Sequence, residues 1–466
     1  MVQIYIFHVR SWNIDFFVNL ESRLISQREQ IKVLWFCMSI SESIYLSRLN
    51  KEVYYLPDLL SNAVININKI DDFEKYMYDT HGFGINLLYQ QERFKPFKSD
   101  SNLWIQKHVS VLLSIIPKDA ISIALSCDHM VYILSSYINE YYSGRSIFVQ
   151  PVGFPMNSQV ILQSPCSLLK FRSVDLDKKV FTDYKESLNH SPLINVNYLI
   201  SKKNISLFSS FVKNFKKLSL FRKQINEFSY LDDLSISFFP NRFKAFFRPT
   251  YVFNYLKIDD LSFLRLKNEV FYFPLQFEPE MTIFVYSNWF KSQLEVIRLI
   301  SQSLRFGDIL ILKENPKMIG EREVDFYKQI EMFPNVFWVD PKENSREIIR
   351  ISSKVISLTG TAVVEAAFLG INSLLFGFAP FRSLLIDEAI ENQKLCNFVD
   401  ILYLFHTSDA IIQHLESGLY EYSKSIILGN YIPQYIDGKF TLQNADILAN
   451  DFSNLVLSNI KVPSHV

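Results

Sequence analysis

Residues 354–377 of the chain read KVISLTGTAVVEAAFLGINSLLFG. The short apolar runs KVISL and NSLLF are typical of buried strands, and the longer segment TAVVEAAFLG between them is typical of a helix. Parallel strands need a crossover connection, which is usually a helix. The stretch therefore predicts a βαβ unit within an α/β fold.

The same alternation runs through the chain from residue 268 onward. Strands are predicted at NEVFYFPLQF (268–277), DILILKENP (308–316) and NVFWVDP (335–341), and helices at SQLEVIRLISQSL (292–304), EVDFYKQIEMF (323–333) and SREIIRISS (345–353). Repeated strand–helix units indicate a parallel sheet with helical crossovers. Residues 268–466 are therefore predicted to form one Rossmann-like domain, and packing of its last helices on the rest of the chain is left open.

A second run of this kind lies at the N-terminus. Strands are predicted at VQIYIFHV (2–9), IKVLWFCMS (31–39), AISIALSC (120–127) and RSIFVQPVGF (145–154), with a helix at HMVYILSSYINEYY (129–142). Residues 1–177 are therefore predicted to form another Rossmann-like domain. A length of 466 residues fits this organisation, since domains average about 100–200 residues.

Composition excludes several classes of protein. Lys+Arg and Asp+Glu number 48 each, so the net charge of zero gives no preference for nucleic acid. Cys37, Cys127, Cys166 and Cys396 are widely spaced, which argues against a zinc site or a disulfide framework and favours a reducing compartment. No signal peptide or run of about 18 apolar residues is recognisable. We expect a cytoplasmic protein.

Residues 178–267 interrupt the alternation and are predicted to form a helical connector. Between 201 and 250 there are ten Lys or Arg and three Asp or Glu, so this part carries a charge of +7. The basic residues could form a solvated helix face. Alternatively, together with the many Phe residues, they could form a surface that contacts anionic lipid or a lipid-linked acceptor at the inner leaflet of the cytoplasmic membrane.

The turn Thr359-Gly360-Thr361 is the first candidate for ligand binding. In open parallel sheets, ligands bind beyond the carboxyl ends of the strands, and this turn joins a strand to a helix. Backbone N–H groups at a helix start suit a phosphate, and Gly360 permits a close approach. Glu365, one turn further, could accept hydrogen bonds from ribose hydroxyls. The alternative is an ordinary threonine cap followed by a first-turn acid.

Two further strand ends carry polar residues. Lys313 ends one strand and could neutralise phosphate charge, with Asn315 beside it as a hydrogen-bond donor; the alternative is a plain strand end at an exposed turn. Gln276 and Glu280 follow another strand, in PLQFEPEMT. They could bind a sugar or a base edge, or cap the next helix.

In order and spacing, these elements resemble the capsule polysaccharide biosynthesis proteins over roughly residues 268–382. FPLQFEPEMT, ILKENP, NVFWVDP and SLTGTAVVEAAFLG carry the resemblance. It implies a GT-B-like fold of two Rossmann-like domains facing a cleft, and a transferase that uses a nucleotide-sugar. The family includes transferases of 3-deoxy-manno-octulosonic acid (Kdo) from a CMP-linked donor.

The chain departs from the pattern of this family at two places. Asn315 stands where the family usually has His, so this position cannot carry a positive charge or move a proton. Residues 163–166 read Gln-Ser-Pro-Cys where Asp-Pro-x-Gly is expected. These departures are compatible with a different donor or an unusual acceptor.

A transferase of this kind also needs a catalytic group in the first domain. Sugar transfer passes through an oxocarbenium-like state, for which a carboxylate serves as base or nucleophile. Asp128 directly follows a predicted strand, and His8 lies at the end of the first strand. The alternatives are that Asp128 caps the following helix and that His8 packs in the core. No metal or other cofactor is required, because helix dipoles and cations can stabilise the leaving phosphate.

We therefore expect a glycosyltransferase that adds a sugar to a bacterial surface polysaccharide or its lipid-linked acceptor. Its partners would be a nucleotide-sugar donor, a glycan or glycolipid acceptor and an anionic membrane surface. A nucleotide-sugar epimerase with the same double fold and a non-catalytic scaffold of capsule assembly are the alternatives, since fold does not decide function.

Overall fold

The computed structural model describes residues 3–10, 13–27, 30–87, 101–127, 129–152, 154, 158–171, 178–190, 255–256, 268–278, 281–287, 290, 292–316, 318, 322–386, 398–428 and 452–454. These residues divide into two compact units. The first holds the described residues up to 171 and from 424 onward, and the second holds those from 178 to 423. Each is built on its own sheet.

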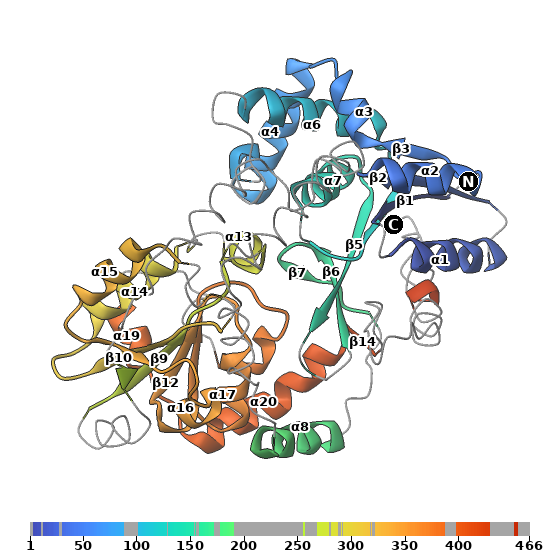
Figure 1. Ribbon diagram of the computed structural model, residues 1–466. Helices are drawn as coiled ribbons and strands as arrows, with labels where there is room; N and C mark the ends of the chain where they lie inside the picture. Colours follow the sequence, from blue (N-terminus) through green and yellow to red (C-terminus); the bar gives the residue numbers. More distant parts are fainter. Residues whose placement is uncertain are drawn as a thin grey trace, which may run out of the picture. The chain divides into compact units, whose positions relative to one another are not determined.

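The first unit contains a largely parallel sheet with helices on both faces (Figure 1). Its elements are β1 (Gln3–Val9), α1 (Ile14–Gln27), β2 (Ile31–Cys37), α2 (Ile40–Arg48), β3 (Val53–Tyr55), α3 (Leu56–Ser61), α4 (Ile67–His81), α6 (Ser101–Ile115), β4 (Ile121–Ala124), α7 (Met130–Tyr141), β5 (Arg145–Val152), β6 (Ser158–Ser164), β7 (Ser167–Leu168) and β14 (Ile426–Leu428).

Strand order identifies the topology of this unit. The parallel strands lie in the order β5-β4-β1-β2-β3, which is the Rossmann order 3-2-1-4-5. Strand β6 adds antiparallel to β5, and both β14 and β7 pair antiparallel to β6. A strand from residues 426–428 thus completes a sheet that begins at residue 3.

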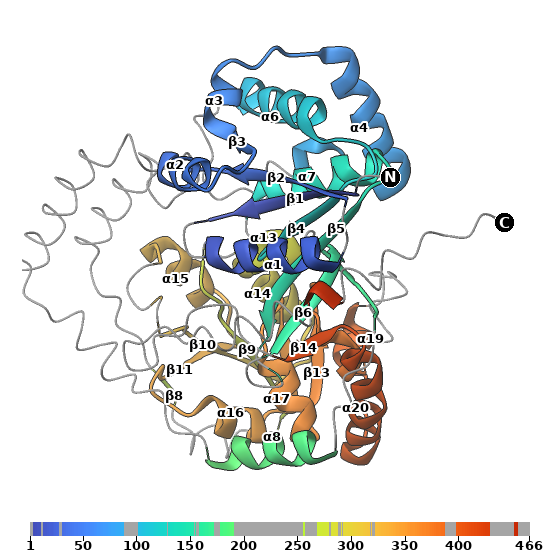
Figure 2. The ribbon, with the colours of Figure 1, turned by 90° about the vertical axis from the view of Figure 1, so that its right-hand side faces the viewer.

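Side-chain alternation explains how this sheet is covered. Phe7 and Trp35 point to the face on which α1 packs, where Phe17 completes an aromatic cluster. His8 and Phe36 point to the opposite face, which α7 covers. Figure 2 shows α1 and α7 on opposite sides of the strands. Both faces are therefore buried, as the apolar strand sequences require.

The second unit has an all-parallel sheet in the order β13-β12-β9-β10-β11-β8. Its elements are α8 (Lys178–His190), β8 (Tyr255–Leu256), β9 (Val270–Pro274), α13 (Met281–Tyr286), α14 (Gln293–Ser303), β10 (Ile309–Lys313), α15 (Val324–Glu331), β11 (Val336–Val339), α16 (Ser345–Ile351), β12 (Lys354–Ser357), α17 (Ala362–Phe368), β13 (Asn372–Leu375), a 3-10 turn (Arg382–Leu384), α19 (Phe398–Leu402) and α20 (Ser408–Ser423). Strands β9 to β13 again follow the Rossmann order.

The prediction of an α/β chain with two Rossmann-like units is confirmed by these sheets. Helix α8, which begins the predicted connector, belongs to the second unit, where Phe181 and Tyr184 pack on Phe368 with ring centroids 5.0 and 4.8 Å apart. The rest of the predicted connector, apart from β8, lies outside the described residues. The shared cleft between the two domains stays a prediction.

Helices that could span a bilayer are absent from the part of the chain that the structure describes. In that part, Cys37, Cys127 and Cys166 form no disulfide.

Strand β14 provides a test of the N-terminal sheet. Ile427 is 5% exposed and lies in the same core cluster as Phe7 and Trp35. We expect Ile427→Ala to lower the free energy of unfolding of the first unit by about 2–5 kcal/mol, because it leaves a cavity. Hydrogen exchange of β6 peptides during urea unfolding measures this. Ile25→Ala on α1, where Ile25 is 51% exposed, should change it by less than about 0.5 kcal/mol. Equal effects of the two substitutions would contradict this placement of β14.

Candidate functional site

The second sheet has a topological switch point, where the chain continues from two neighbouring strands in opposite directions across the sheet. Strand β9 continues to β10 on one side, while its other neighbour β12 continues to β13 away from it. The crevice beyond the carboxyl ends of two such strands is where open α/β sheets bind ligands. Gln276 follows β9 and Thr359 follows β12, so both lie at this point.

Gln276 bridges the crevice. Its Nε2 donates a hydrogen bond of 2.9 Å to Oγ1 of Thr359. Its backbone is held by Gln293, which accepts from the Gln276 N–H at 2.7 Å and donates to the Gln276 carbonyl at 3.2 Å. Two residues that the sequence singled out separately are thus joined, 83 positions apart.

The other polar atom of the Gln276 amide, Oε1, is a candidate contact for a ligand. This oxygen is buried and has no hydrogen-bond partner among the described residues. A buried acceptor without a donor costs about 1–3 kcal/mol. A ligand hydroxyl or N–H would recover this energy, so the atom is suited to a ribose, a sugar or a base edge.

Gly360 lies directly beside the Gln276–Thr359 hydrogen bond, where space is limited. Its N–H donates to Oγ of Ser357 at 2.9 Å. A Cβ at this position would lie 2.8 Å from that oxygen and 3.3 Å from Gln276 Nε2. A larger residue would therefore displace the Ser357 hydroxyl and press on the Gln276 amide.

Thr361 starts helix α17 without capping it. Its side chain is exposed and makes no cap hydrogen bond. Thr361 therefore occupies the N-cap position, with Glu365 in the first turn, but its hydroxyl makes no cap hydrogen bond. The first N–H groups of the helix have no acceptor within the helix.

Arg322 is a member of the site that sequence reasoning missed. Its side chain is 3% exposed and donates to the Gln276 carbonyl (Nη2, 2.6 Å) and to Glu314 (Nε, 2.9 Å), and it pairs with Glu278. Burial raises the pKa of Glu314, and Arg322 opposes that rise. The sequence shows only a mixed charged run at 321–323, which resembles any exposed helix start.

Asn315 lies beside this network. Its backbone N–H donates to Oε1 of Glu314 at 2.8 Å. The loop after β10 is therefore shaped by a buried carboxylate, Glu314, which also accepts from the Tyr327 hydroxyl at 3.1 Å.

Lys313 lies on the other face of the sheet, under α16. Its Nζ donates to Oγ of Ser345 at 2.7 Å, and the residue is 8% exposed. Burial lowers the pKa of Lys313 to about 8, against the attraction of Glu343, Asp340 and Glu365. The amine therefore stays mostly protonated at pH 7, near acidic side chains and beneath α16 rather than at the open strand end that the sequence predicted.

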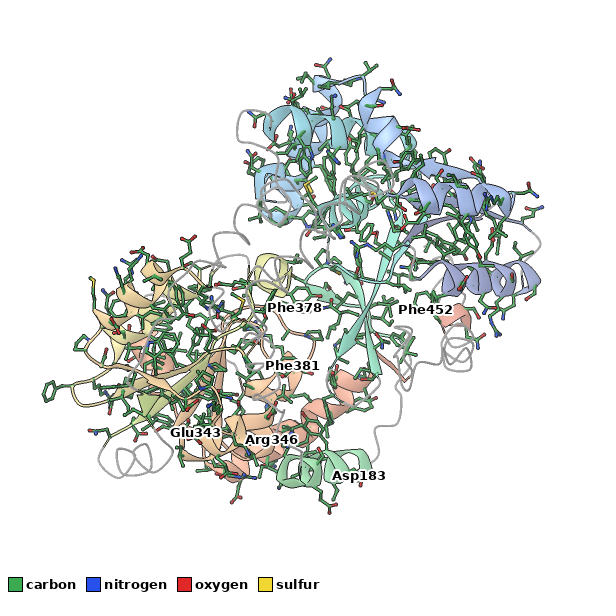
Figure 3. The ribbon with its side chains drawn as sticks, in the orientation of Figure 1. Asp183, Glu343, Arg346, Phe378, Phe381 and Phe452 are labelled. Atoms are coloured by element: carbon green, nitrogen blue, oxygen red, sulfur yellow. The ribbon has the colours of Figure 1, made fainter. Side chains whose placement is uncertain are left out.

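Glu365 is also paired. Nε of Arg346 lies 3.4 Å from its Oε2, and burial raises the pKa of Glu365 while Arg346 opposes that rise. The same arginine donates from Nη1 to the carbonyls of Ser187 and Leu188 at 2.9 and 3.0 Å. Figure 3 shows Arg346 beside α8, the helix that carries Asp183. Glu365 thus helps to hold α8, and a ribose would have to share it with Arg346.

The equivalent switch point of the first unit lies between β1 and β4, where His8 is found. His8 is 1% exposed, its Nε2 lies 3.0 Å from Ser122 Oγ, and its ring packs between Phe36 and Tyr132. Burial lowers the pKa of His8 to about 3. An imidazole with so low a pKa is a weak base, and at 1% exposure it has little access to a substrate, so this environment favours packing over catalysis.

Arg10 is the polar residue directly after β1, and sequence reasoning missed it. Its Nε donates to the Tyr132 hydroxyl at 3.1 Å, in the first turn of α7. Its backbone N–H donates to Oδ1 of Asn13 at 2.7 Å. Because it stands directly after a strand, this residue could have been recognised as a candidate from the sequence. The guanidinium of Arg10 is therefore held at the carboxyl edge of this sheet.

Two predicted site residues, Asp128 and Glu280, lie outside the described residues. The neighbour of Asp128, His129, is the N-cap residue of α7 and makes no side-chain cap hydrogen bond. No group of three His, Cys, Asp or Glu side chains suited to a metal ion occurs within the described ranges.

Comparison with known proteins gives structural neighbours only. No protein-family model matches the chain, and no curated protein matches it. It is similar to Thermosulfurimonas dismutans KpsC, a beta Kdo 2,7 transferase, with 11% identity, a TM-score of 0.35 and coverage of 97% of this chain and 99% of that chain. It is also similar to Anabaena HepE in complex with UDP-glucose, with 11% identity, a TM-score of 0.25 and coverage of 98% and 100%.

A third neighbour is a putative UDP-N-acetylglucosamine 2-epimerase from Listeria monocytogenes, with 10% identity, a TM-score of 0.23 and coverage of 100% of this chain and 99% of that chain. The fold of the present chain is established by its own strand order. The roles of its residues rest on the contacts described above.

The buried amine of Lys313 makes a pH prediction. The folded pKa of about 8 lies below the ordinary value of 10.5, so the unfolded chain binds more protons between these two pH values. Stability should therefore rise as pH rises from about 8 to 10.5, by roughly 3 kcal/mol from this group. Urea unfolding of wild type and Lys313→Met should show the wild type gaining about that much relative to the variant. A constant difference across this range, as expected for the exposed control Lys342→Met, would contradict the burial of the charge.

Proposed function

We propose that the chain is a nucleotide-sugar-dependent glycosyltransferase that adds a sugar to a bacterial surface polysaccharide or its lipid-linked acceptor. The observation that carries the proposal is the group of residues that meet at the β9/β12 switch point. There a bridging Gln276, an acceptor atom without a donor and Gly360 occur together. The resemblance of residues 268–382 to capsule polysaccharide biosynthesis proteins supports a donor such as CMP-linked Kdo or another acidic sugar.

The crevice has the groups needed for a nucleotide. Oε1 of Gln276 would accept a hydrogen bond from a ribose hydroxyl or a base N–H. Gly360 and Thr361, at the start of α17, would lie against phosphate, where backbone N–H groups and a hydroxyl are donors. Arg322 acts from below the surface, since it holds the loops after β9 and β10 through Gln276 and Glu314. Lys313 holds the start of α16 through Ser345.

Catalysis would need groups from the first unit. We assign the carboxylate of Asp128 as base or nucleophile for the oxocarbenium-like transition state. Arg10, at the carboxyl edge of the same sheet, is suited to an anionic group of the acceptor. His8 has no catalytic role in this proposal; its ring packs against Tyr132 in the core.

The partners follow from this reaction. The acceptor would be a glycan or glycolipid, and the basic segment 201–250 would hold the enzyme at the anionic inner leaflet, with the rest in the cytoplasm. No part of this scheme uses nucleic acid, a metal or another cofactor.

Calorimetric titration with CMP, UDP and GDP tests the donor site. We expect one nucleotide to bind wild type, and Gln276→Ala and Gly360→Ala each to weaken it about tenfold or more, since each disrupts the bridge to Thr359. Gln329→Ala, an exposed glutamine on α15, is the matched control and should leave affinity unchanged. Absence of binding by all three nucleotides would favour a scaffold, and unchanged affinity in both folded site variants would move the site elsewhere.

Asp128→Asn tests the transfer step. A group that acts in the transition state should lower kcat by roughly 10²–10⁴-fold while leaving donor affinity nearly intact. Release of labelled nucleotide, with and without a glycan acceptor, measures this. Wild-type turnover that changes the donor sugar without any acceptor would identify an epimerase, and full activity of Asp128→Asn would remove this residue from catalysis.

A further inference from the structure

The first unit contains a cavity of about 380 Å³ that the proposed reaction does not use. Polar side chains from five segments converge on it: His81, Glu140, Arg145, Gln163, Ser164 and Ser167. A volume of this size lies within the range of about 300–1,000 Å³ typical of small-molecule sites.

This cavity lies at the amino edge of the sheet. It is lined by Ile121, the first residue of β4, and by Arg145, the first residue of β5. Ser164 ends β6, which runs antiparallel to β5 and so returns to the same edge. The candidate residues of this unit, Arg10 and Asp128, follow the carboxyl ends of β1 and β4. The cavity is therefore separated from them by the length of the strands.

The lining combines an apolar surface with hydrogen-bonding groups. Ile121, Ile147 and Leu169 supply the apolar part. Arg145 and Glu140 contribute one positive and one negative charge, so together they favour neither an anionic nor a cationic ligand. A ligand with an apolar ring face and several hydroxyl groups satisfies both parts of such a lining.

Two polar groups of the lining are held in place before any ligand arrives. The His81 ring packs on Tyr76, Phe83 and Tyr137, with centroids 5.8, 5.9 and 4.8 Å away, and its Nε2 lies 3.5 Å from Oε2 of Glu140. Gln163 donates from Nε2 to Ser167 Oγ at 2.8 Å, which fixes its amide. Fixed donors and acceptors lose little conformational entropy on binding.

We propose that this cavity binds a short, neutral segment of a glycan, at a site separate from the nucleotide crevice. Gln163, Ser164 and Ser167 contact its hydroxyls, and the half-buried Leu169 contacts the apolar face of a sugar ring. The inference goes beyond the proposed transferase activity, because it does not depend on which nucleotide or sugar is transferred. A second glycan site would keep a polymer on the enzyme between catalytic events.

Saturation-transfer NMR tests this on the full chain. The probes are the trimers of glucose, N-acetylglucosamine and xylose as neutral glycans, and the trimer of galacturonic acid as an acidic one. We expect transfer to at least one neutral trimer. Ser164→Trp should abolish the signal by filling the cavity, and Gln163→Ala should weaken affinity by about fivefold, as the loss of one hydrogen bond implies. Gln329→Ala is the matched control and should behave as wild type.

The outcomes separate this site from the donor site. CMP, UDP and GDP should not displace the trimer, and Ser164→Trp should bind nucleotide as wild type does. The proposal is overturned if no neutral trimer shows transfer, if Ser164→Trp keeps the signal, or if a nucleotide competes with the trimer. A chain that binds neutral trimer but no nucleotide would leave this site standing and remove the proposed donor site.

Discussion

The hydrogen bond from Gln276 to Thr359 lies at the switch point of the second sheet, where the strand order reverses. Strands β9 and β12 are neighbours, yet the chain leaves them toward opposite sides. Their following loops therefore diverge, and a side chain must cross the gap. Gln276 does so, and it is itself held by Gln293 and Arg322. The shape of the candidate crevice depends on that bridge.

Buried charges lie on both faces of the sheet, and one of them, Arg322, contacts the bridge. Arg322 lies among Glu314, Glu278 and the Gln276 carbonyl on one side, and Lys313 lies under α16 on the other. Removing charges from water costs energy unless partners and hydrogen bonds compensate. Such clusters contribute little to stability, but their hydrogen bonds favour one conformation of the loops that they join. Here these are the loops that would contact a nucleotide.

The first unit repeats the strand order and uses it differently. Its switch-point histidine is enclosed by aromatic rings and is held in the neutral form. Its carboxyl edge offers Arg10, and its amino edge offers a cavity rich in hydroxyl and amide groups. Two sheets of one topology thus present different chemistry, because topology determines where loops meet and not which side chains they carry.

The sequence by itself determined the class of fold and the positions where ligand-binding residues could stand. Alternating strand and helix patterns, such as residues 354–377, predict a parallel sheet, and the residues after each strand are then candidates. Gln276, Thr359 and Gly360 were found in this way. Only the tertiary structure decided which candidates meet. Strand adjacency brings Gln276 to Thr359, and a charged run without any distinctive pattern supplies Arg322. Burial, which periodicity cannot quantify for a polar residue, placed His8 in the core and Lys313 beneath a helix. Local patterns reflect the period of one element, whereas pairing and burial depend on contacts between residues far apart in the chain.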